Sequence, residues 1–222
     1  MKIVAIIGSP HGKRGNTARL TDYVIEGAQA EGAVVETALL KGRTIGPCAG
    51  CDVCHKVGRC CQQDEFEALR ERIETADGVI LASPNYIFHV SAQLKAFIDR
   101  CCGVIHRLGF EGKYGVSVVT SGGGGDEPIV EYMNRFLLAT GIRPVGGVHA
   151  TMAALPDEKF TSELQAQART LGATLVQSWR EKRTELDVER QMEEFRAGMR
   201  ELIHWRREEW PFEHAWWQQR QA

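Results

Sequence analysis

Short apolar segments and amphipathic segments alternate along the first 155 residues, and this alternation restricts the fold more than any other feature. The apolar segments, rich in β-branched residues, are residues 2–7, 33–40, 77–83, 114–121 and 142–150. Segments with apolar residues at helical spacing lie between them, at residues 17–32, 64–76, 91–102 and 127–141. Strands that alternate with helices form βαβ units with right-handed crossovers around a parallel sheet. The sequence therefore predicts an α/β fold with a doubly wound sheet of five parallel strands. The fifth strand is the weakest prediction, because it contains Pro144 and two glycines.

Residues 156–222 contain no further strand pattern. Two more amphipathic helices are predicted there, at residues 162–182 and 187–209. The chain is therefore expected to consist of one domain at residues 1–155 and a C-terminal helical extension at residues 156–222. Four of the five tryptophans lie between Trp205 and Trp217. They either pack against the domain or cover a partner subunit, since aromatic residues are enriched at interfaces. We expect a homodimer or homotetramer.

Composition excludes several classes of partner. The formal net charge is −2, so no general basic character attracts nucleic acid or anionic lipid. The apolar run at the N-terminus is too short for a signal peptide or a membrane span. The expectation is a cytoplasmic protein without nucleic-acid or membrane partners. Thiols stay reduced in that compartment, where clustered cysteines favour metal or redox chemistry over structural disulfides.

The glycine-rich segment "GSPHGKRGNT", residues 8–17, follows the first predicted strand. It is not a P-loop, because Arg14 stands where that motif needs serine or threonine. It is not the dinucleotide fingerprint either, because Gly8, Gly12 and Gly15 are spaced four and three residues apart. The segment does not match either of these nucleotide-binding motifs.

The same segment suits a single phosphate group. Ser9 and Thr17 offer hydroxyls, and Gly15 allows the backbone to approach closely. Lys13 or Arg14 could supply positive charge, and the start of the following helix presents free N–H groups to an anion. The alternative is an ordinary strand-to-helix turn with Asn16 as the N-cap.

Three segments resemble the signatures of a known family. "GSPHGKRGNTARL" resembles the FMN-phosphate loop of the NAD(P)H-dependent FMN reductase family of flavodoxin-like proteins. "DGVILASPNYIFHVSAQLKAFIDR" is similar to the second signature, whose turn lines the flavin ring, and "VVTSGGGGDE" to the third. The resemblance implies a flavodoxin-like fold that binds FMN and takes electrons from NAD(P)H. The residues that it places at the cofactor are Ser9, His11, Arg14, Gly15, Asn16, Thr17, Pro84, Asn85, Tyr86, Ile87, Thr120, Gly122 and Gly123.

The chemistry of these segments agrees with the resemblance. Residues 84–87 follow a strand end and can bond the edge of a flat ring, while Tyr86 or Ile87 shields its face. Residues 122–125 place unhindered amides where negative charge would develop on a reduced flavin. No acid–base residue is required, since hydride chemistry belongs to the cofactor. His89, His106 and His149 are therefore expected to be structural or merely exposed, and no residue is assigned a catalytic role.

Five of the seven cysteines lie within residues 47–61. Several clustered thiolates are the soft donors that iron–sulfur clusters require. The cysteines predicted to bind one cluster, most naturally [4Fe–4S], have the spacing C-x2-C-x2-C-x5-C and are Cys48, Cys51, Cys54 and Cys60. This spacing resembles the compact motif of the iron–sulfur flavoproteins, a branch of the same family. Cys61 leaves the fourth ligand open between Cys60 and Cys61, and free or disulfide-forming thiols or a zinc site remain alternatives.

Cys101 and Cys102 are poor ligand candidates, because they end the third predicted helix, far from its flavin-side start. The predicted function is an FMN-containing NAD(P)H-dependent oxidoreductase or electron-transfer flavoprotein. Its partners would be a nicotinamide nucleotide and a small-molecule or protein electron acceptor. The alternative is a redox-sensing or zinc-binding module that uses the cysteine loop and has no catalytic flavin.

Overall fold

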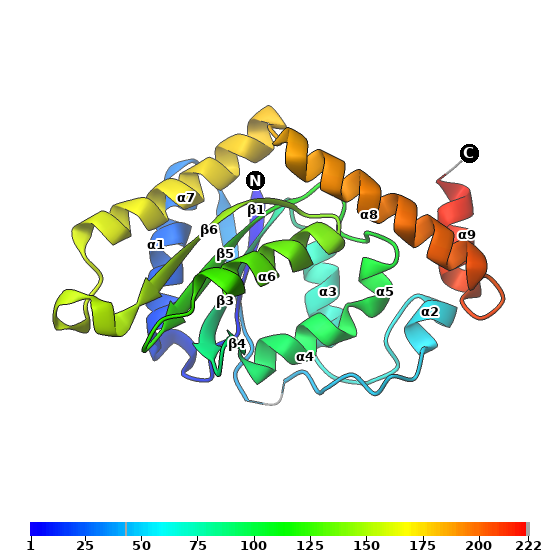
Figure 1. The fold of residues 1–222 in the computed structure, drawn as a ribbon, viewed down its shortest axis with the longest axis horizontal. Coiled ribbons are helices and arrows are strands. Elements are labelled where there is room, and N and C mark those ends of the chain that lie inside the picture. The colour runs from blue at the N-terminus through cyan, green and yellow to red at the C-terminus, as the bar shows by residue number, and fades with distance from the viewer. Residues whose placement is uncertain (43, 221–222) are drawn as a thin grey trace.

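A computed structural model describes residues 1–42 and 44–220 of the chain. Five parallel strands form its central sheet in the order β2-β1-β3-β5-β6 (Figure 1). The strands are β1 (Lys2–Ile7), β2 (Val34–Leu39), β3 (Gly78–Tyr86), β5 (Tyr114–Ser121) and β6 (Arg143–Thr151). A two-residue strand, β4 (His89–Val90), pairs antiparallel with the end of β3. The predicted doubly wound sheet of five parallel strands is confirmed.

The burial of the strands explains why they could be predicted from the sequence. The central strands β1, β3 and β5 are covered on both faces, and β5 is buried along its whole length. Strands in that position appear as continuous apolar runs. The weakly predicted fifth strand is an edge strand, β6, and its register shifts between Gly115 and Val116 of β5. The register passes from Pro144 to Gly146 and skips Val145, so β6 carries one extra residue beside Pro144.

Helices cover both faces of the sheet (Figure 1). One face packs against α3 (Phe66–Glu74), α4 (Ala92–Arg100) and α6 (Glu127–Ala139). The other packs against α1 (Asn16–Ala30) and α7 (Ser162–Glu181). Glycines allow α1 and α7 to approach closely, because a Cβ on Gly172 would lie 1.9 Å from the carbonyl oxygen of Val24. The first helix of the predicted extension thus completes a layer of the sheet domain, and the division at residue 155 stays a prediction.

The remaining helices lie together at one side of the sheet (Figure 1). They are α2 (Val53–Val57), α5 (Cys102–Ile105), α8 (Leu186–Trp205) and α9 (Pro211–Gln219). The sequence predicted α8 but not α2, α5 or α9. Three short 3₁₀ turns complete the described elements, at Gly12–Arg14, Met152–Ala154 and Pro156–Glu158.

The C-terminal segment covers the cysteine loop. A small core of Leu108, Ile203 and Trp217 joins α8 and α9 to the segment after α5. The ring of Phe212 lies over Gly58, where an added Cβ would come within 2.3 Å of it. Three of the four C-terminal tryptophans pack against this chain, whereas Trp205 is 69% exposed. Of the two predicted roles, packing against the protein's own chain therefore applies to three of these tryptophans.

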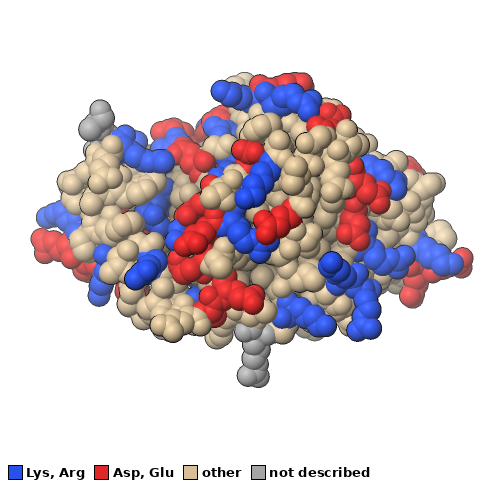
Figure 2. Space-filling view, turned by 180° about the vertical axis from the view of Figure 1, so that it is seen from behind, with Lys and Arg blue, Asp and Glu red and all other residues tan. Residues whose placement is uncertain are grey.

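The hydropathy of the described helices and the charge distribution on one face of the surface (Figure 2) bear on membrane and charged partners. No helix among the described residues combines the length and the apolar character that crossing a bilayer requires. Figure 2 shows Lys and Arg interspersed with Asp and Glu over the face that it presents. Mixed charge of this kind agrees with the formal net charge of −2.

Candidate functional site

Three loops meet at the carboxyl edge of the sheet. They follow β1, β3 and β5, which are neighbours in the sheet. The Gly8 N–H donates to the Ala82 carbonyl at 2.8 Å, which fixes the first loop against β3. The hydroxyls of Thr17 and Thr120 lie 2.7 Å apart and join the first loop to the third. Ligands bind at this edge in open α/β sheets, and the three sequence-predicted segments lie together there.

The first loop forms an anion cradle at the start of α1. Ser9 and Thr17 are buried, and a Cβ on Gly15 would lie 2.9 Å from the Ser9 hydroxyl oxygen. The N-terminus of α1 has no side-chain cap, so its first N–H groups remain available to an anion. Gly15 occupies the N-cap position and Asn16 is the first helical residue, so the alternative with Asn16 as N-cap is wrong. Two further predicted residues, His11 and Arg14, are exposed beside the cradle.

The second loop is a strained hairpin with an apolar tip. β3 and β4 are joined by Ile87 and Phe88, which have φ values of 50° and 63°. Two-residue hairpins with positive φ at both positions normally use Asn or Gly, and a β-branched residue is an outlier there. The two side chains are also 89% and 83% exposed. Strain and apolar exposure at one spot are typical of a surface that a ligand covers.

The third loop is tied to the second. The Asn85 amide donates to the carbonyl oxygens of Gly124 at 2.9 Å and Gly125 at 3.2 Å. Gly122 and Gly123 border open space, since an added Cβ at either would meet no atom within 4 Å. The Oδ1 atom of Asp126 is buried without a hydrogen-bond partner at the end of this loop. An anion cradle, an apolar tip and unhindered amides on adjoining loops fit the phosphate and ring of FMN.

The structure locates the remaining site predictions as follows. Pro84 pairs in register with Thr120, and both are buried at the strand ends. Tyr86 is 42% exposed beside the hairpin tip. Of the histidines, His89 is exposed and lies against Tyr132, and His149 is exposed near Asp126.

The cysteine loop lies between β2 and α3, and all seven cysteines are free thiols. Cys48 and Cys51 are exposed, whereas Cys54 and Cys60 are half-buried. The sulfurs of Cys51 and Cys61 lie 3.5 Å apart. The four predicted ligands are not packed as closely as the ligands of a single ion. A four-iron cluster holds its thiolates further apart than one ion does, and reduced, accessible thiols are the donors that it needs.

Positive charge is fixed beside one of these thiols. The Arg100 guanidinium donates to the Cys60 sulfur at 3.1 Å and is held from behind by the Asp64 carboxylate. Asp64 also accepts from the Gly46 N–H at 2.9 Å and the Phe66 N–H at 3.1 Å. Burial opposes ionisation of Asp64, but the bond from Arg100 and these two N–H groups lower the pKa of its carboxyl. Asp64 therefore fixes both the start of the cysteine loop and the cation at Cys60.

Beside Cys54 the structure groups residues that the sequence analysis kept apart. His55, Cys102, His106 and Glu213 come from α2, α5, the residue after α5, and α9. The predicted third helix ends at Arg100, and Cys102 begins α5, which turns its side chain toward His106. The i, i+4 spacing of Cys102 and His106 was the available signal for a shared helix face. No pattern in the sequence linked them to Glu213.

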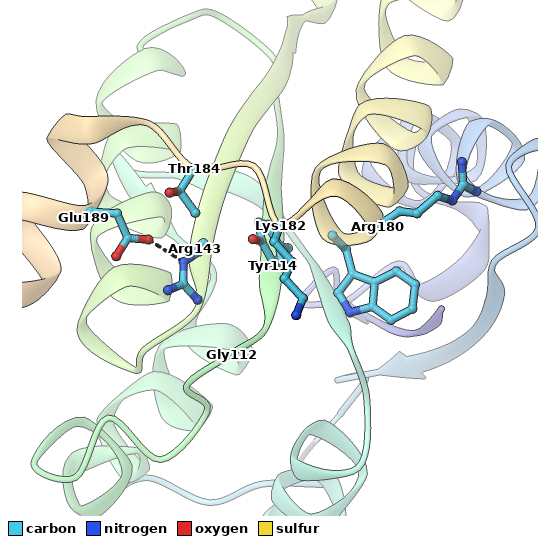
Figure 3. Close-up of a pocket in the computed structure, with 8 residues that line it drawn as sticks. Gly112, Tyr114, Arg143, Arg180, Lys182, Thr184 and Glu189 are labelled. Carbon is cyan, nitrogen blue, oxygen red and sulfur yellow. Dashed lines mark hydrogen bonds and ion pairs between the residues drawn. The ribbon is translucent and has the colours of Figure 1, made fainter.

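A cavity of about 680 Å³ lies elsewhere. Figure 3 shows its lining, in which Arg143 pairs with Glu189 beside Tyr114. Tyr114 and Arg143 begin β5 and β6, so this cavity opens at the amino end of the strands. Flavin sites of doubly wound folds lie at the opposite end, and cavity size therefore does not identify this site.

Comparison with known proteins agrees with the fold and identifies the family. Residues 1–155 match the family model described as NADPH-dependent FMN reductase. The chain is 38% identical over 183 residues to an iron–sulfur flavoprotein of Archaeoglobus fulgidus, which covers 82% of each chain. It is 35% identical over 150 residues to an iron–sulfur flavoprotein of Methanocaldococcus jannaschii, covering 66% of this chain and 76% of that one.

Solved structures support the fold. A flavone reductase superposes with a TM-score of 0.64 at 16% identity, covering 83% of this chain and 66% of that one. A flavodoxin from the domain Archaea superposes with a TM-score of 0.54 at 12% identity, covering 81% of this chain and 99% of that one. Together with the three converging loops, the sequence matches place this chain in the NADPH-dependent FMN reductase family, among the relatives of the iron–sulfur flavoproteins.

Proposed function

We propose that the protein is an FMN-containing oxidoreductase that takes electrons from NAD(P)H. It delivers them through a [4Fe–4S] cluster to a small-molecule or protein acceptor, in the reducing environment of the cytoplasm. The observation that carries the proposal is the meeting of the anion cradle, the hairpin tip and the glycine loop at one sheet edge. FMN held there would supply hydride-accepting chemistry, and a cluster held by the cysteine loop would supply one-electron transfer.

The phosphate of FMN would bind at the N-terminus of α1. Ser9, Gly15, Asn16 and Thr17 line that position, and Arg14 and His11 stand outside it. The bond between Thr17 and Thr120 holds the cradle against the third loop. These residues bind and orient the cofactor, and the helix dipole favours its negative charge.

The flavin ring would lie between the second and third loops. Pro84, Asn85, Tyr86 and Ile87 would hold it from the hairpin side, and Gly122 and Gly123 from the other. The apolar tip excludes water from one face of the ring. The glycine N–H groups stabilise negative charge on the ring edge, and no side chain needs to move a proton.

The cluster would be bound by Cys48, Cys51, Cys54 and Cys60. Supporting this, these thiols share one loop, and Arg100 places a fixed cation on the Cys60 sulfur. Hydrogen bonds and charge at a ligand sulfur are the protein's means of tuning a cluster's potential. The contact also favours Cys60 over Cys61 as the fourth ligand, since the Arg100 guanidinium donates to the Cys60 sulfur.

Anaerobic purification tests the proposal. We expect bound FMN, near-stoichiometric iron and sulfide, and bleaching of the flavin on mixing with NADH or NADPH. Gly15→Val should abolish FMN retention because its side chain fills the cradle, whereas Gly198→Ala, which meets open space on α8, should retain it. Cys51→Ser should lose iron, and Cys101→Ser, at a fully buried thiol outside the loop, should keep it. A protein that binds no flavin, or whose flavin neither nucleotide reduces, contradicts the proposal.

One contact favours a second function for the cysteine loop. The 3.5 Å separation of the Cys51 and Cys61 sulfurs suits a reversible disulfide in a redox-sensing module. The N–H of Val53 and the Cys61 thiol lower the pKa of the Cys51 thiol, which favours the reactive thiolate. A colourless protein that gains a Cys51–Cys61 disulfide on mild oxidation would favour this alternative.

A further inference from the structure

Four ionisable side chains form a buried group between α2, α5 and α9. His55, His106 and Glu213 are respectively 3%, 8% and 0% exposed, and Cys102 is half-buried beside them. They lie outside the flavin site and are not among the proposed cluster ligands. Ionisable groups are rarely buried together unless they are paired or bind a metal.

The Glu213 carboxylate contacts the Nδ1 atom of both imidazoles, with one oxygen on each ring. Its Oε1 lies 2.7 Å from the Nδ1 of His55, and its Oε2 lies 2.9 Å from the Nδ1 of His106. The two rings are stacked, with centroids 4.6 Å apart and planes 21° apart. Trp210 packs against both, at 4.7 and 4.8 Å between centroids. When each Nδ1–H donates to the carboxylate, each Nε2 keeps a free lone pair.

A thiol completes the group. The Cys102 sulfur lies 3.7 Å from the Nε2 of His106, and one ligand atom from each of His55, Cys102 and His106 lies within 4.8 Å of the others. Among the described residues this is the one set of three such side chains that meets that spacing. A cysteine thiolate and imidazole nitrogens are donors that bind zinc.

We propose that His55, Cys102 and His106 bind one zinc ion, with Glu213 as the outer carboxylate that orients both imidazoles. A tetrahedral zinc ion has Zn–N distances of about 2.0 Å and Zn–S distances of about 2.3 Å. Its ligand atoms are then about 3.5 Å from one another, close to the separation of Cys102 and His106. One thiolate and two imidazoles are donors that zinc accepts, and the fourth position is taken by solvent.

The outer contacts support a metal rather than a set of shared protons. A histidine that binds zinc almost always donates its other N–H to a carboxylate or carbonyl, as both rings do here. A divalent cation neutralises the thiolate and the carboxylate together. On the solvent side, the Asp52 carboxylate lies 3.8 Å from the Nε2 of His55, where it adds negative charge.

The site would fasten α9 to the cysteine loop. Glu213 and Trp210 belong to the C-terminal segment, His55 belongs to α2, and Cys54, next in the chain, is a proposed cluster ligand. Metal bound by His55 therefore restrains Cys54 through one peptide unit. The role is structural, and the restraint acts on the geometry of the loop.

Zinc analysis of two matched variants tests the proposal. The first, Cys48→Ser with Cys51→Ser, removes two cysteines of the loop and leaves the proposed zinc ligands intact. The second, Cys102→Ser with His106→Gln, removes two of those ligands. After dialysis against a weak chelator, we expect about one zinc per chain in the first variant and none in the second. Cys101→Ser, at the adjacent buried thiol, should keep its zinc.

X-ray absorption at the zinc edge gives a readout that does not depend on the second variant folding. In the Cys48→Ser, Cys51→Ser protein we expect one sulfur at about 2.3 Å and two imidazole nitrogens at about 2.0 Å. Glu213→Gln should weaken zinc binding about 10- to 100-fold in a chelator competition, because one imidazole loses its oriented acceptor. A sulfur-rich first shell, zinc lost with Cys48 and Cys51 but kept without Cys102 and His106, or no zinc in any variant, overturns the proposal. All these outcomes are independent of flavin binding.

Discussion

The strained hairpin tip gives a prediction in which stability and cofactor binding change in opposite directions. Ile87 and Phe88 have positive φ values and are almost fully exposed, so they contribute little to the folded domain. Replacing them with the preferred pair, Ile87→Asn with Phe88→Gly, should relieve the strain and remove the apolar tip. We expect the flavin-free protein to become more stable and FMN to bind more weakly.

The magnitudes follow from the backbone and the exposure. Each non-glycine residue in the left-handed region destabilises the fold by about 1–2 kcal/mol. The glycine introduced at Phe88 offsets about 0.5–1 kcal/mol of this gain, because it loses more backbone entropy on folding. The net gain should be about 1–3 kcal/mol, or about 2–12 °C in Tm for a chain of this size. Covering one face of the two side chains is worth about 1 kcal/mol each, against about 1.5–3 kcal/mol for complete burial. FMN affinity should therefore fall about 10- to 30-fold.

The assay combines thermal unfolding of the flavin-free protein with FMN titration by fluorescence quenching. Leu186→Asn is the control, because Leu186 is 91% exposed at the start of α8 without a positive φ. It removes the same kind of surface and should change neither quantity. A double variant that is less stable without FMN, or that binds FMN as tightly as the parent, would refute the reasoning.

Three further predictions concern the scaffold. Asp64→Asn should lower the free energy of unfolding at neutral pH by about 1–3 kcal/mol, because it weakens the charged bond to Arg100. The lowered pKa of the Asp64 carboxyl means that this stability is present above about pH 4 and is lost as pH falls through the folded-state pKa. The free energy of unfolding measured with urea should therefore decrease less at acidic pH in the variant than in the parent protein. An equal decrease in both contradicts this. Gly172→Ala should lower the free energy of unfolding by at least about 2 kcal/mol, because the added Cβ forces α7 away from α1. The control Gly198→Ala, in α8, should raise it by up to about 1 kcal/mol. Equal effects in denaturant unfolding would show that the close approach is unimportant. Light scattering should give a dimer or tetramer that Trp205→Glu, at the exposed tryptophan, shifts toward the monomer, and a monomeric parent protein would overturn the expected assembly.

Secondary structure was predictable where burial is uniform. The apolar runs of β1, β3 and β5 are covered on both sides, so their sequence pattern carries the fold by itself. The phosphate cradle was also predictable, because a strand, a glycine turn and a helix start are adjacent in the chain. Local propensity and global fold agree in these segments.

The sequence could not predict features that depend on distant or strained residues. Glu213 lies 158 residues from His55, and α9 has no strong amphipathic pattern, so nothing local linked them. The hairpin tip could not be predicted because Ile87 and Phe88 contradict the residue preferences of the turn that they form. Cys102 was set aside because the third helix was expected to continue through it, whereas α4 ends at Arg100 and a new helix begins.

The packing of Phe212 over Gly58, with Glu213 next to it in α9, can form only after the last helix has been synthesised. A ribosome releases the N-terminal part of a chain first, and domains form as they emerge. The cysteine loop and α5 therefore exist for a time before α9 is synthesised. Once α9 docks, the Phe212 ring covers the loop at a distance that leaves no room for a Cβ on Gly58. His55, His106 and Glu213 are brought together only by that docking, so the last helix completes this buried group after the cysteine loop has formed.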